Sequence, residues 1–463
     1  MRNKYETRHF FRNLSQARPF THIGVHIMMP NRLPLALGAL AAGSILLSGC
    51  AASSAASAPE ASVAAAANIA DCDPAENTIT ATYGLMAAEA MAIATANLQE
   101  TYPELTIDAT PPSTSDYNEL TKTVVADIAV GNRPDLIMTG LGQLQFWVDT
   151  YSPAAIDVSA LRPSYKTQFL GAGTVDGTVY LATNQISATV LLVNQDALDS
   201  ADAGDAKDIE TLDDLVAAAE KVTADTGKPS VTIPTEGLPD WFSQALVQGS
   251  GETYVNDDGT AGFGSEKAIE ALSIWSTLKN KDLELGVAGN QDAIAQFVGG
   301  NAAFLVWTTS GIATIQEGIG DAFNWMPVDL PSVEGDEEGA LPAGGNGWIV
   351  LSEDACRAAY SNALIAELLS PEAVSAASGT SYSYIPVDNE AGDALLASDA
   401  ATKQLTYAWS YDKPLTPWGG FAGKDTMEVF DTVRLMAQKL QSGADATETV
   451  NEAVTNIDLI VSE

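Results

Sequence analysis

Histidine is nearly absent from this 463-residue sequence. Its three histidines, His9, His22 and His26, all lie within the first 26 residues. If that segment is removed, the mature chain has no histidine to serve as a general base or as a metal ligand. This excludes Ser-His-Asp and Cys-His catalysis from the mature protein, and we expect neither a metal site nor a cofactor.

Basic residues are also scarce, since 22 Lys and Arg stand against 60 Asp and Glu, for a formal net charge of −38. Residues 1–49 contain six of the basic residues and one acidic residue, which leaves a formal charge of −43 on the remainder. Phosphate binding needs clustered Lys and Arg, so nucleic acid is excluded as a partner and anionic membrane surfaces are disfavoured. The acidic surface either keeps an exported protein soluble or attracts a cationic ligand, and the net charge alone does not distinguish these two roles.

Long apolar runs are missing except near the start of the chain. Residues 33–47 are uncharged and mostly apolar, too short to span a membrane and typical of a signal-peptide core. The residues Leu47-Ser48-Gly49-Cys50 that follow resemble the lipobox of bacterial lipoproteins, in which the cysteine becomes the lipidated first residue. We therefore expect residues 1–49 to be a signal peptide, with Met28 or Met29 as alternative starts. The protein would be exported and anchored to the outer face of the cytoplasmic membrane.

Cysteine is the other rare residue type. Beyond Cys50 there are only Cys72 and Cys356, and in an oxidising compartment these two either form a disulfide or remain separate buried thiols. Residues 51–67 are small, nearly uncharged and of low complexity, so residues 50–68 are expected to be a flexible tether.

Strand-like and helix-like segments alternate through the body, which indicates an α/β fold with mainly parallel sheets. The first expected strands are 79–83, 105–109 and 135–138, and the helices between them are 85–100 and 117–130. Because ligands of such sheets bind beyond the carboxyl ends of the strands, Tyr83-Gly84 and Thr139–Gln143 are candidates for the rim of a site. Further helices are expected at 212–226, 265–279, 291–298, 353–369, 397–409, 424–441 and 446–456.

Turn and cap signals refine this outline. Asp176-Gly177 predicts a hairpin turn within 173–181, and 186–194 is predicted to be one apolar strand. Thr211–Asp214 has the form of a capping box at a helix start. Asn256–Gly259 lacks the spacing and terminal Glu of a calcium loop, so it is predicted to be a β-turn.

From residue 77 onward the chain resembles the extracellular solute-binding proteins of ABC importers, in the group that includes maltose- and other sugar-binding receptors. Eight segments carry the resemblance in the family's order: Ile79–Tyr83 with its following helix, Gly131–Leu136, Gly177–Ala182, Leu191–Asp196, Thr211–Leu215, Phe297–Phe304, Met326–Pro331 and Gly344–Ile349. The sequence departs from the family pattern in two of these segments. Gly177–Ala182 has Ala or Thr where the family usually has Pro, and Thr211–Leu215 lacks the usual Trp. These departures bear on which ligand is bound more than on the fold.

The resemblance implies a two-lobed periplasmic-binding-protein-like α/β fold whose lobes are joined by crossing strands. The crossings would lie near 183–187, 342–346 and 381–386. Lobe one would comprise 69–185 and 345–381, and lobe two 186–344 and 382–463. Cys72 and Cys356 would then both belong to lobe one, where a disulfide would not lock the hinge.

A sugar offers hydroxyl groups to polar side chains and C–H faces to aromatic rings, so the eight tryptophans are the first candidates for contact. We expect Trp241, Trp307, Trp348 and Trp418 to line the ligand site, because they follow turn-rich loops, strand ends or the glycine-rich crossing. The other four lie within apolar runs and are expected in the core: Trp147, Trp275, Trp325 and Trp409.

Polar partners are expected at strand ends and crossings, where the alternative for each residue is a local turn or backbone hydrogen bond. These candidates are Tyr83, Glu89, Gln143, Asn184, Asn346 and Tyr384.

The resemblance implies a monomeric receptor that is not an enzyme, captures a sugar or oligosaccharide by hinge closure and delivers it to a membrane permease. One alternative is a receptor for a cationic solute such as a polyamine, which an acidic, aromatic-rich cleft also suits. A secreted glycoside hydrolase is the other alternative, because carboxylates are abundant.

Overall fold

The computed structural model describes residues 63–462 apart from 111–113, 115, 336–338 and 422–425. The predicted signal peptide, its alternative starts and Cys50 lie outside the described residues. No helix within the described ranges is both long and apolar enough to cross a membrane.

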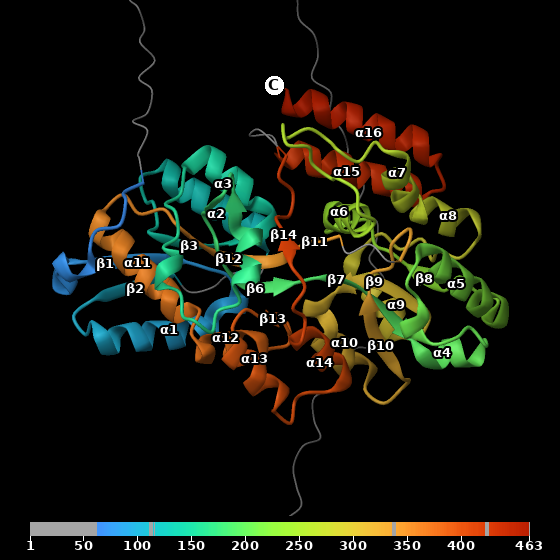
Figure 1. Ribbon diagram of the computed structural model, residues 1–463, viewed down its shortest axis with the longest axis horizontal. Helices are drawn as coiled ribbons and strands as arrows, with labels where there is room; N and C mark the ends of the chain where they lie inside the picture. The colour runs from blue at the N-terminus through green and yellow to red at the C-terminus, as the bar shows by residue number, and fades with distance from the viewer. Residues whose placement is uncertain (1–62, 111–113, 115, 336–338, 422–425, 463) are drawn as a thin grey trace, which may run out of the picture. The chain divides into compact units, whose positions relative to one another are not determined.

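The larger of the two main sheets has six strands in the order β13-β6-β12-β3-β1-β2 (Figure 1). They are β1 (Thr78–Thr82), β2 (Thr106–Thr110), β3 (Leu136–Gly140), β6 (Ala182–Ser187), β12 (Gly344–Val350) and β13 (Ile385–Pro386). The three N-terminal strands are parallel, whereas β12 runs antiparallel to both β3 and β6. The α/β class is therefore confirmed, with mixed sheets rather than mainly parallel ones.

Helices cover this sheet, and several begin at the polar caps that the sequence provides. They are α1 (Ala88–Thr101), α2 (Tyr117–Ala129), α3 (Leu144–Tyr151), α11 (Ala355–Leu368) and α12 (Pro371–Ser378). At the start of α2, the Asp116 carboxylate accepts hydrogen bonds from the backbone of Asn118 and Glu119, which satisfies two amide groups that a helix terminus leaves without partners. This cap fixes the first turn of α2 beside the end of β3.

The second main sheet has four strands in the order β10-β7-β9-β8. They are β7 (Thr189–Asn194), β8 (Val231–Thr232), β9 (Phe304–Thr308) and β10 (Trp325–Asp329). The helices packed around it are α4 (Gln195–Ser200), α5 (Leu212–Thr226), α6 (Pro239–Gly249), α7 (Glu266–Leu272), α8 (Ile274–Asn280), α9 (Asn290–Val298), α10 (Ile312–Ile319), α14 (Lys403–Trp409), α15 (Thr426–Gln441) and α16 (Ala446–Val461). Helix α13 (Asn389–Leu396) contributes to both hydrophobic cores, because Ala391 packs in the core around the larger sheet and Leu395 in the core around the smaller one.

Each sheet has its own hydrophobic core. One core includes residues from 72–188 and 343–391 together with Tyr411 and Leu415, and the other includes residues from 190–328 and 395–457. We define lobe one as the described residues of 63–188, 343–391 and 411–416, and lobe two as those of 189–342, 392–410 and 417–462. These limits differ from the expected ones mainly at the third crossing, because Tyr384 and Val387 are buried in the core of lobe one.

The single strand predicted at 186–194 is wrong, because two strands in different sheets occupy it. Strand β6 ends at Ser187 in the larger sheet, and β7 begins at Thr189 in the smaller one. The backbone N–H of Ala188 between them donates to Thr309 Oγ1. An apolar run buried in both sheets gives no sign in the sequence that it changes lobe.

Other predicted elements lie close to the observed ones. The hairpin forms through β4 (Thr174–Val175) and β5 (Thr178–Val179), and the capping box of Thr211 and Asp214 is present. Residues 256–259 form a turn closed by the Gly259 N–H and the Asn256 carbonyl oxygen. The helix predicted from 397 begins only at Lys403, after the Thr402 cap, and the helix predicted at 265–279 is divided at Ser273.

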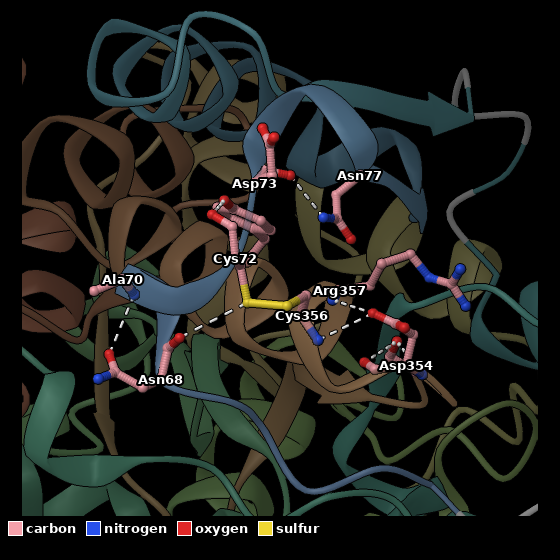
Figure 2. The surroundings of a disulfide bond; sticks show 10 residues. Asn68, Ala70, Cys72, Asp73, Asn77, Asp354, Cys356 and Arg357 are labelled. Atoms are coloured by element: carbon pink, nitrogen blue, oxygen red, sulfur yellow. Dashed lines mark hydrogen bonds between the residues drawn. A yellow bond between two sulfur atoms is a disulfide. The ribbon is translucent and has the colours of Figure 1, made fainter.

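The N-terminal end of the described chain lies along α11. The backbone N–H groups of Ala64 and Ala67 donate to the carbonyl oxygens of Ser352 and Ala355 at 2.9 Å, so the predicted tether is already bound to lobe one in its last residues. Cys72 and Cys356 are bonded to each other, which is the first of the two alternatives left open by the sequence (Figure 2).

Candidate functional site

A network of uncharged polar side chains lies where β6 and β12 cross between the lobes. The Asn346 amide donates to Tyr117 Oη at 3.1 Å and to Gln185 Oε1 at 2.9 Å. The hydroxyl groups of Tyr117 and Tyr384 are 3.3 Å apart, and Gln185 donates to the Met86 carbonyl oxygen. The predicted residues Asn346 and Tyr384 are therefore brought together by two residues that the sequence reasoning missed.

The phenols of this network stay neutral. Burial raises the pKa of Tyr117 above its ordinary value of 10 and raises that of Tyr384 well above it. Uncharged hydroxyl and amide groups both donate and accept, which is the property that recognition of a hydroxyl-bearing ligand requires.

Gln143 lies at the edge of the same region, after the carboxyl end of β3. Its side-chain oxygen accepts from Thr121 and Thr139, and its Nε2 donates to Asn118 Oδ1 at 2.8 Å. Three partners fix the amide, so Gln143 orients the start of α2 as much as it offers a group to a ligand.

Three predicted residues carry buried polar atoms without partners among the described residues. Both amide atoms of Asn184 are unpaired although the residue is only 2% exposed, and Trp348 Nε1 is unpaired in a ring that is fully buried. Asn346 Oδ1 is the fourth such atom. Buried polar groups are normally satisfied, so these unsatisfied atoms on the crossing strands mark a place for a ligand or for water.

A second group of predicted residues meets at the start of α6 in lobe two. The indole ring centroids of Trp241 and Trp418 are 5.9 Å apart. Trp418 Nε1 donates to Asp240 Oδ2 at 2.7 Å, and Trp241 Nε1 donates to the Pro342 carbonyl oxygen at 3.0 Å. Asp240 is buried, and burial raises the pKa of its carboxyl group to about 6. The Trp418 indole therefore binds a buried carboxyl group whose pKa is about 6.

Trp307 extends this aromatic group toward the strand end of β9. It lies 6.1 Å from the Phe242 ring and is 7% exposed, while Trp241 is 1% exposed. Both rings are consequently part of the core of lobe two as well as candidates for ligand contact. Trp418 is the one predicted tryptophan that is partly exposed.

The two groups of residues touch across the lobes at glycines. A Cβ added to Gly142, beside Gln143, would lie 2.8 Å from Trp418 Cδ2, and one added to Gly344 would lie 2.7 Å from Trp241 Cζ2. Only a residue without a side chain permits these close approaches of ring and backbone. The indoles of lobe two thus pack directly on the backbone of lobe one.

The remaining two predicted residues lie at the margin. Tyr83 is buried with its ring centroid 6.4 Å from that of Trp348. Glu89 is exposed in the first turn of α1, and the structure gives it no contact with the other candidates. Among the described residues, no group of His, Cys, Asp and Glu could hold a metal ion.

A hollow of about 810 Å³ lies beside the crossings, between β10 and the segment 407–414, and its lining includes Thr189 and Leu341. Its polar lining includes Lys207, Glu210, Asp329 and Lys413, and none of the predicted site residues borders it. We place the candidate site at the crossing strands and at the indoles that pack on them rather than in this hollow, because unsatisfied buried polar groups and clustered indoles occur there.

Sequence reasoning missed Tyr117, Gln185 and Asp240. Asp240 could have been found, because it directly precedes a chosen tryptophan in a turn-rich loop. Tyr117 gave no such signal, since its place at a helix start says nothing of the crossing strands that it meets.

Two α/β lobes joined by crossing strands, with polar and aromatic residues between them, define a solute-binding protein. The model for bacterial extracellular solute-binding proteins matches residues 96–405, and the chain belongs to that family. No curated protein gives a significant match to the chain.

Solved structures share the fold. The GacH receptor of Streptomyces glaucescens, solved without ligand and with acarbose, is 15% identical with a TM-score of 0.65, over 83% of this chain and 98% of that one. UgpB from Mycobacterium tuberculosis, in complex with glycerophosphocholine, is 16% identical with a TM-score of 0.69, over 82% and 98%. MalE from Listeria monocytogenes, in complex with maltose, is 19% identical with a TM-score of 0.64, over 83% and 98%.

Proposed function

We propose that the protein is the substrate-binding lipoprotein of an ABC importer and that it captures a sugar or oligosaccharide between its lobes. The observation that carries this proposal is the network of Tyr117, Gln185, Asn346 and Tyr384 on the crossing strands. These groups are neutral and can both donate and accept hydrogen bonds, as sugar hydroxyls demand.

The aromatic rings complement this network. Sugars present C–H faces that stack on indoles, and Trp241, Trp307 and Trp418 form a connected aromatic group on the lobe-two side. Similar structures solved with acarbose and with maltose support a carbohydrate ligand. We retain Trp348, Tyr83, Gln143 and Asn184 as further ligand contacts, and Glu89 as the least supported of the predicted set.

Capture works by hinge closure. A solute that contacts both lobes stabilises the closed arrangement by its additional contacts there. The monomeric closed form then docks on the permease subunits in the membrane, held nearby by a lipid on Cys50. No covalent chemistry on the solute is required, so the protein is proposed not to be an enzyme.

Asp240 favours a second candidate, a cationic solute such as a polyamine. Its carboxyl group lies beside the indoles of Trp241 and Trp418, and a carboxylate with aromatic rings suits an ammonium group. The hydroxyl and amide network on the crossing strands favours the sugar.

A thermal-shift screen followed by calorimetry tests the proposal. The panel comprises monosaccharides, malto-oligosaccharides, putrescine and spermidine, at two salt concentrations. We expect a carbohydrate to raise the melting temperature and to bind with an affinity insensitive to salt. Binding of polyamines alone, weakened by salt, would support the second candidate. Release of reducing sugar from a bound oligosaccharide would contradict both and indicate a hydrolase.

A further inference from the structure

The loop at residues 417–420 is tied to α6 by three hydrogen bonds. The Gln244 side chain donates to the Pro417 carbonyl oxygen at 3.0 Å and accepts from the Gly419 N–H at 2.9 Å. The third bond is the one from Trp418 Nε1 to the Asp240 carboxyl group. The backbone on either side of Trp418, and its side chain, are therefore held by lobe two.

The side chain held in this way reaches lobe one. The indole of Trp418 lies against Gly142, where a Cβ would approach Cδ2 to 2.8 Å and both Cε2 and Cε3 to 3.0 Å. Three ring atoms at nearly equal distances mean that the face of the indole, rather than its edge, covers this glycine. The Gly142 carbonyl oxygen also lies near Gly419, 3.7 Å from the position of an added Cβ.

This contact joins the lobes without a solute. Asp240 and Gln244 are buried in lobe two, and Gly142 is buried in lobe one. Because the indole N–H is already bonded to Asp240, Trp418 cannot offer that donor to a ligand without breaking the bond. The ring is thus oriented toward the opposite lobe.

We propose that Asp240, Trp418 and Gly142 form an interlobe latch, in which Asp240 positions the Trp418 indole so that its face docks on Gly142 and stabilises closure before a solute binds. This proposal depends on the proposed function in one respect, namely that closure of the lobes serves to capture a solute. Asp240 is a positioning residue that acts through Trp418. The apparent affinity for a solute depends on the fraction of the receptor that is already closed, because closing the remainder costs free energy. Residues of the latch therefore influence affinity without touching the solute.

Substitutions separate the parts of the latch. Gly142→Ala places a methyl group against the indole and should force it away, and Gly142 has no left-handed backbone angle that would penalise alanine. Asp240→Leu removes the acceptor for Trp418, whereas Asp240→Asn keeps an acceptor oxygen and should rescue the latch. Gly264→Ala is the matched control, because its added Cβ would have its nearest neighbour at 3.9 Å.

The measurement is the distance between spin labels on exposed positions of the two lobes, Lys122 and Lys228, in the ligand-free protein. We expect Gly142→Ala and Asp240→Leu to reduce the closed-to-open ratio by about tenfold, the effect of losing roughly one well-packed or hydrogen-bonded contact. Asp240→Asn and Gly264→Ala should leave the ratio within about twofold of the parent, a margin far smaller than the effect of one lost contact. Melting temperatures identify any variant that fails to fold, and Gly142→Ala and Asp240→Leu serve as independent tests.

Identical distance distributions in the parent, Gly142→Ala and Asp240→Leu would overturn the latch. So would an Asp240→Asn variant as open as Asp240→Leu, because Asp240 would then not act through its acceptor oxygen. No solute enters this measurement, so a failure to find a sugar ligand would contradict the proposed function and leave the latch standing.

Discussion

Cys72 and Cys356, which are separated by 284 positions in the sequence, form a disulfide within one core. The bond ties the N-terminal segment to the first turn of α11, where Asp354 caps the helix by accepting from the N–H groups of Cys356 and Arg357 (Figure 2). Tyr360, one turn further on, donates its hydroxyl hydrogen to the Cys72 carbonyl oxygen at 2.9 Å. The disulfide therefore strengthens lobe one and leaves the crossings unlinked.

Replacing both cysteines by serine should lower the stability of lobe one by about 2–5 kcal/mol, because a long loop in the unfolded chain is released. Solute affinity should remain within about twofold, since neither residue lies at a crossing; twofold corresponds to less than about 0.5 kcal/mol. Denaturant unfolding followed by calorimetry on the folded variant checks both statements. A large loss of affinity with unchanged stability would show that the bond acts on the hinge.

Tyr117→Phe removes one hydroxyl group from the network on the crossing strands. We expect solute affinity to fall by about tenfold, the effect of one lost hydrogen bond, with a loss of stability of about 1 kcal/mol. Tyr360→Phe is the control, because it also removes one tyrosine hydroxyl with a hydrogen-bond partner but lies beside Cys72, away from the site. Equal affinities of the two variants would exclude the Tyr117 hydroxyl from recognition.

Glu284 should make the protein less stable as the pH rises. Burial raises the pKa of this carboxyl group to about 8, Oε1 accepts from Gln441, and Oε2 has no partner among the described residues. The folded state therefore holds a proton that the unfolded state releases above its ordinary pKa of 4.5. The contribution of Glu284 to stability is therefore greatest below that value, decreases through the interval up to about 8 and is then level.

Glu284→Gln removes this dependence. The variant should be more stable than the parent by about 3–5 kcal/mol at pH 8.5, and the difference should disappear near pH 4. Urea unfolding across this range measures it. Glu220→Gln, which removes an exposed carboxylate paired with Lys281, should change stability by less than about 1 kcal/mol at every pH. A difference between variant and parent that does not grow with pH over this interval would contradict the assignment.

The sequence predicts those elements whose signals are local. The capping box at Thr211 forms as expected, and Trp147, Trp275, Trp325 and Trp409 are all buried, as their apolar surroundings indicated. A helix cap or an apolar periodicity depends on neighbours within a few residues, so it can be predicted from the sequence alone.

The crossings and the site depend on distant neighbours instead. Nothing in the run from Ile186 to Asn194 shows that it leaves one sheet for another at Ala188. Likewise, Asp240 becomes a partner of Trp418 only through the meeting of α6 with a loop 178 residues later. The burial of two further rings could not be predicted from the sequence either. Trp307 lies at a strand end and Trp348 in the glycine-rich crossing, which suggested exposure to a ligand, but both rings lie in the cores.

Asn184 offers the sharpest test of the solute site. Its two amide atoms are buried and have no partner within the described part of the chain, which costs free energy in the ligand-free protein unless water satisfies them. Asn184→Leu, of similar size, should stabilise that protein by about 1–3 kcal/mol and weaken solute binding by at least about tenfold. Thr232→Val is the control: Thr232 Oγ1 is also buried without a partner, but it lies in β8 of lobe two. Its replacement should stabilise the protein without changing affinity, whereas unchanged binding by Asn184→Leu would assign the Asn184 amide to bound water and remove it from the site.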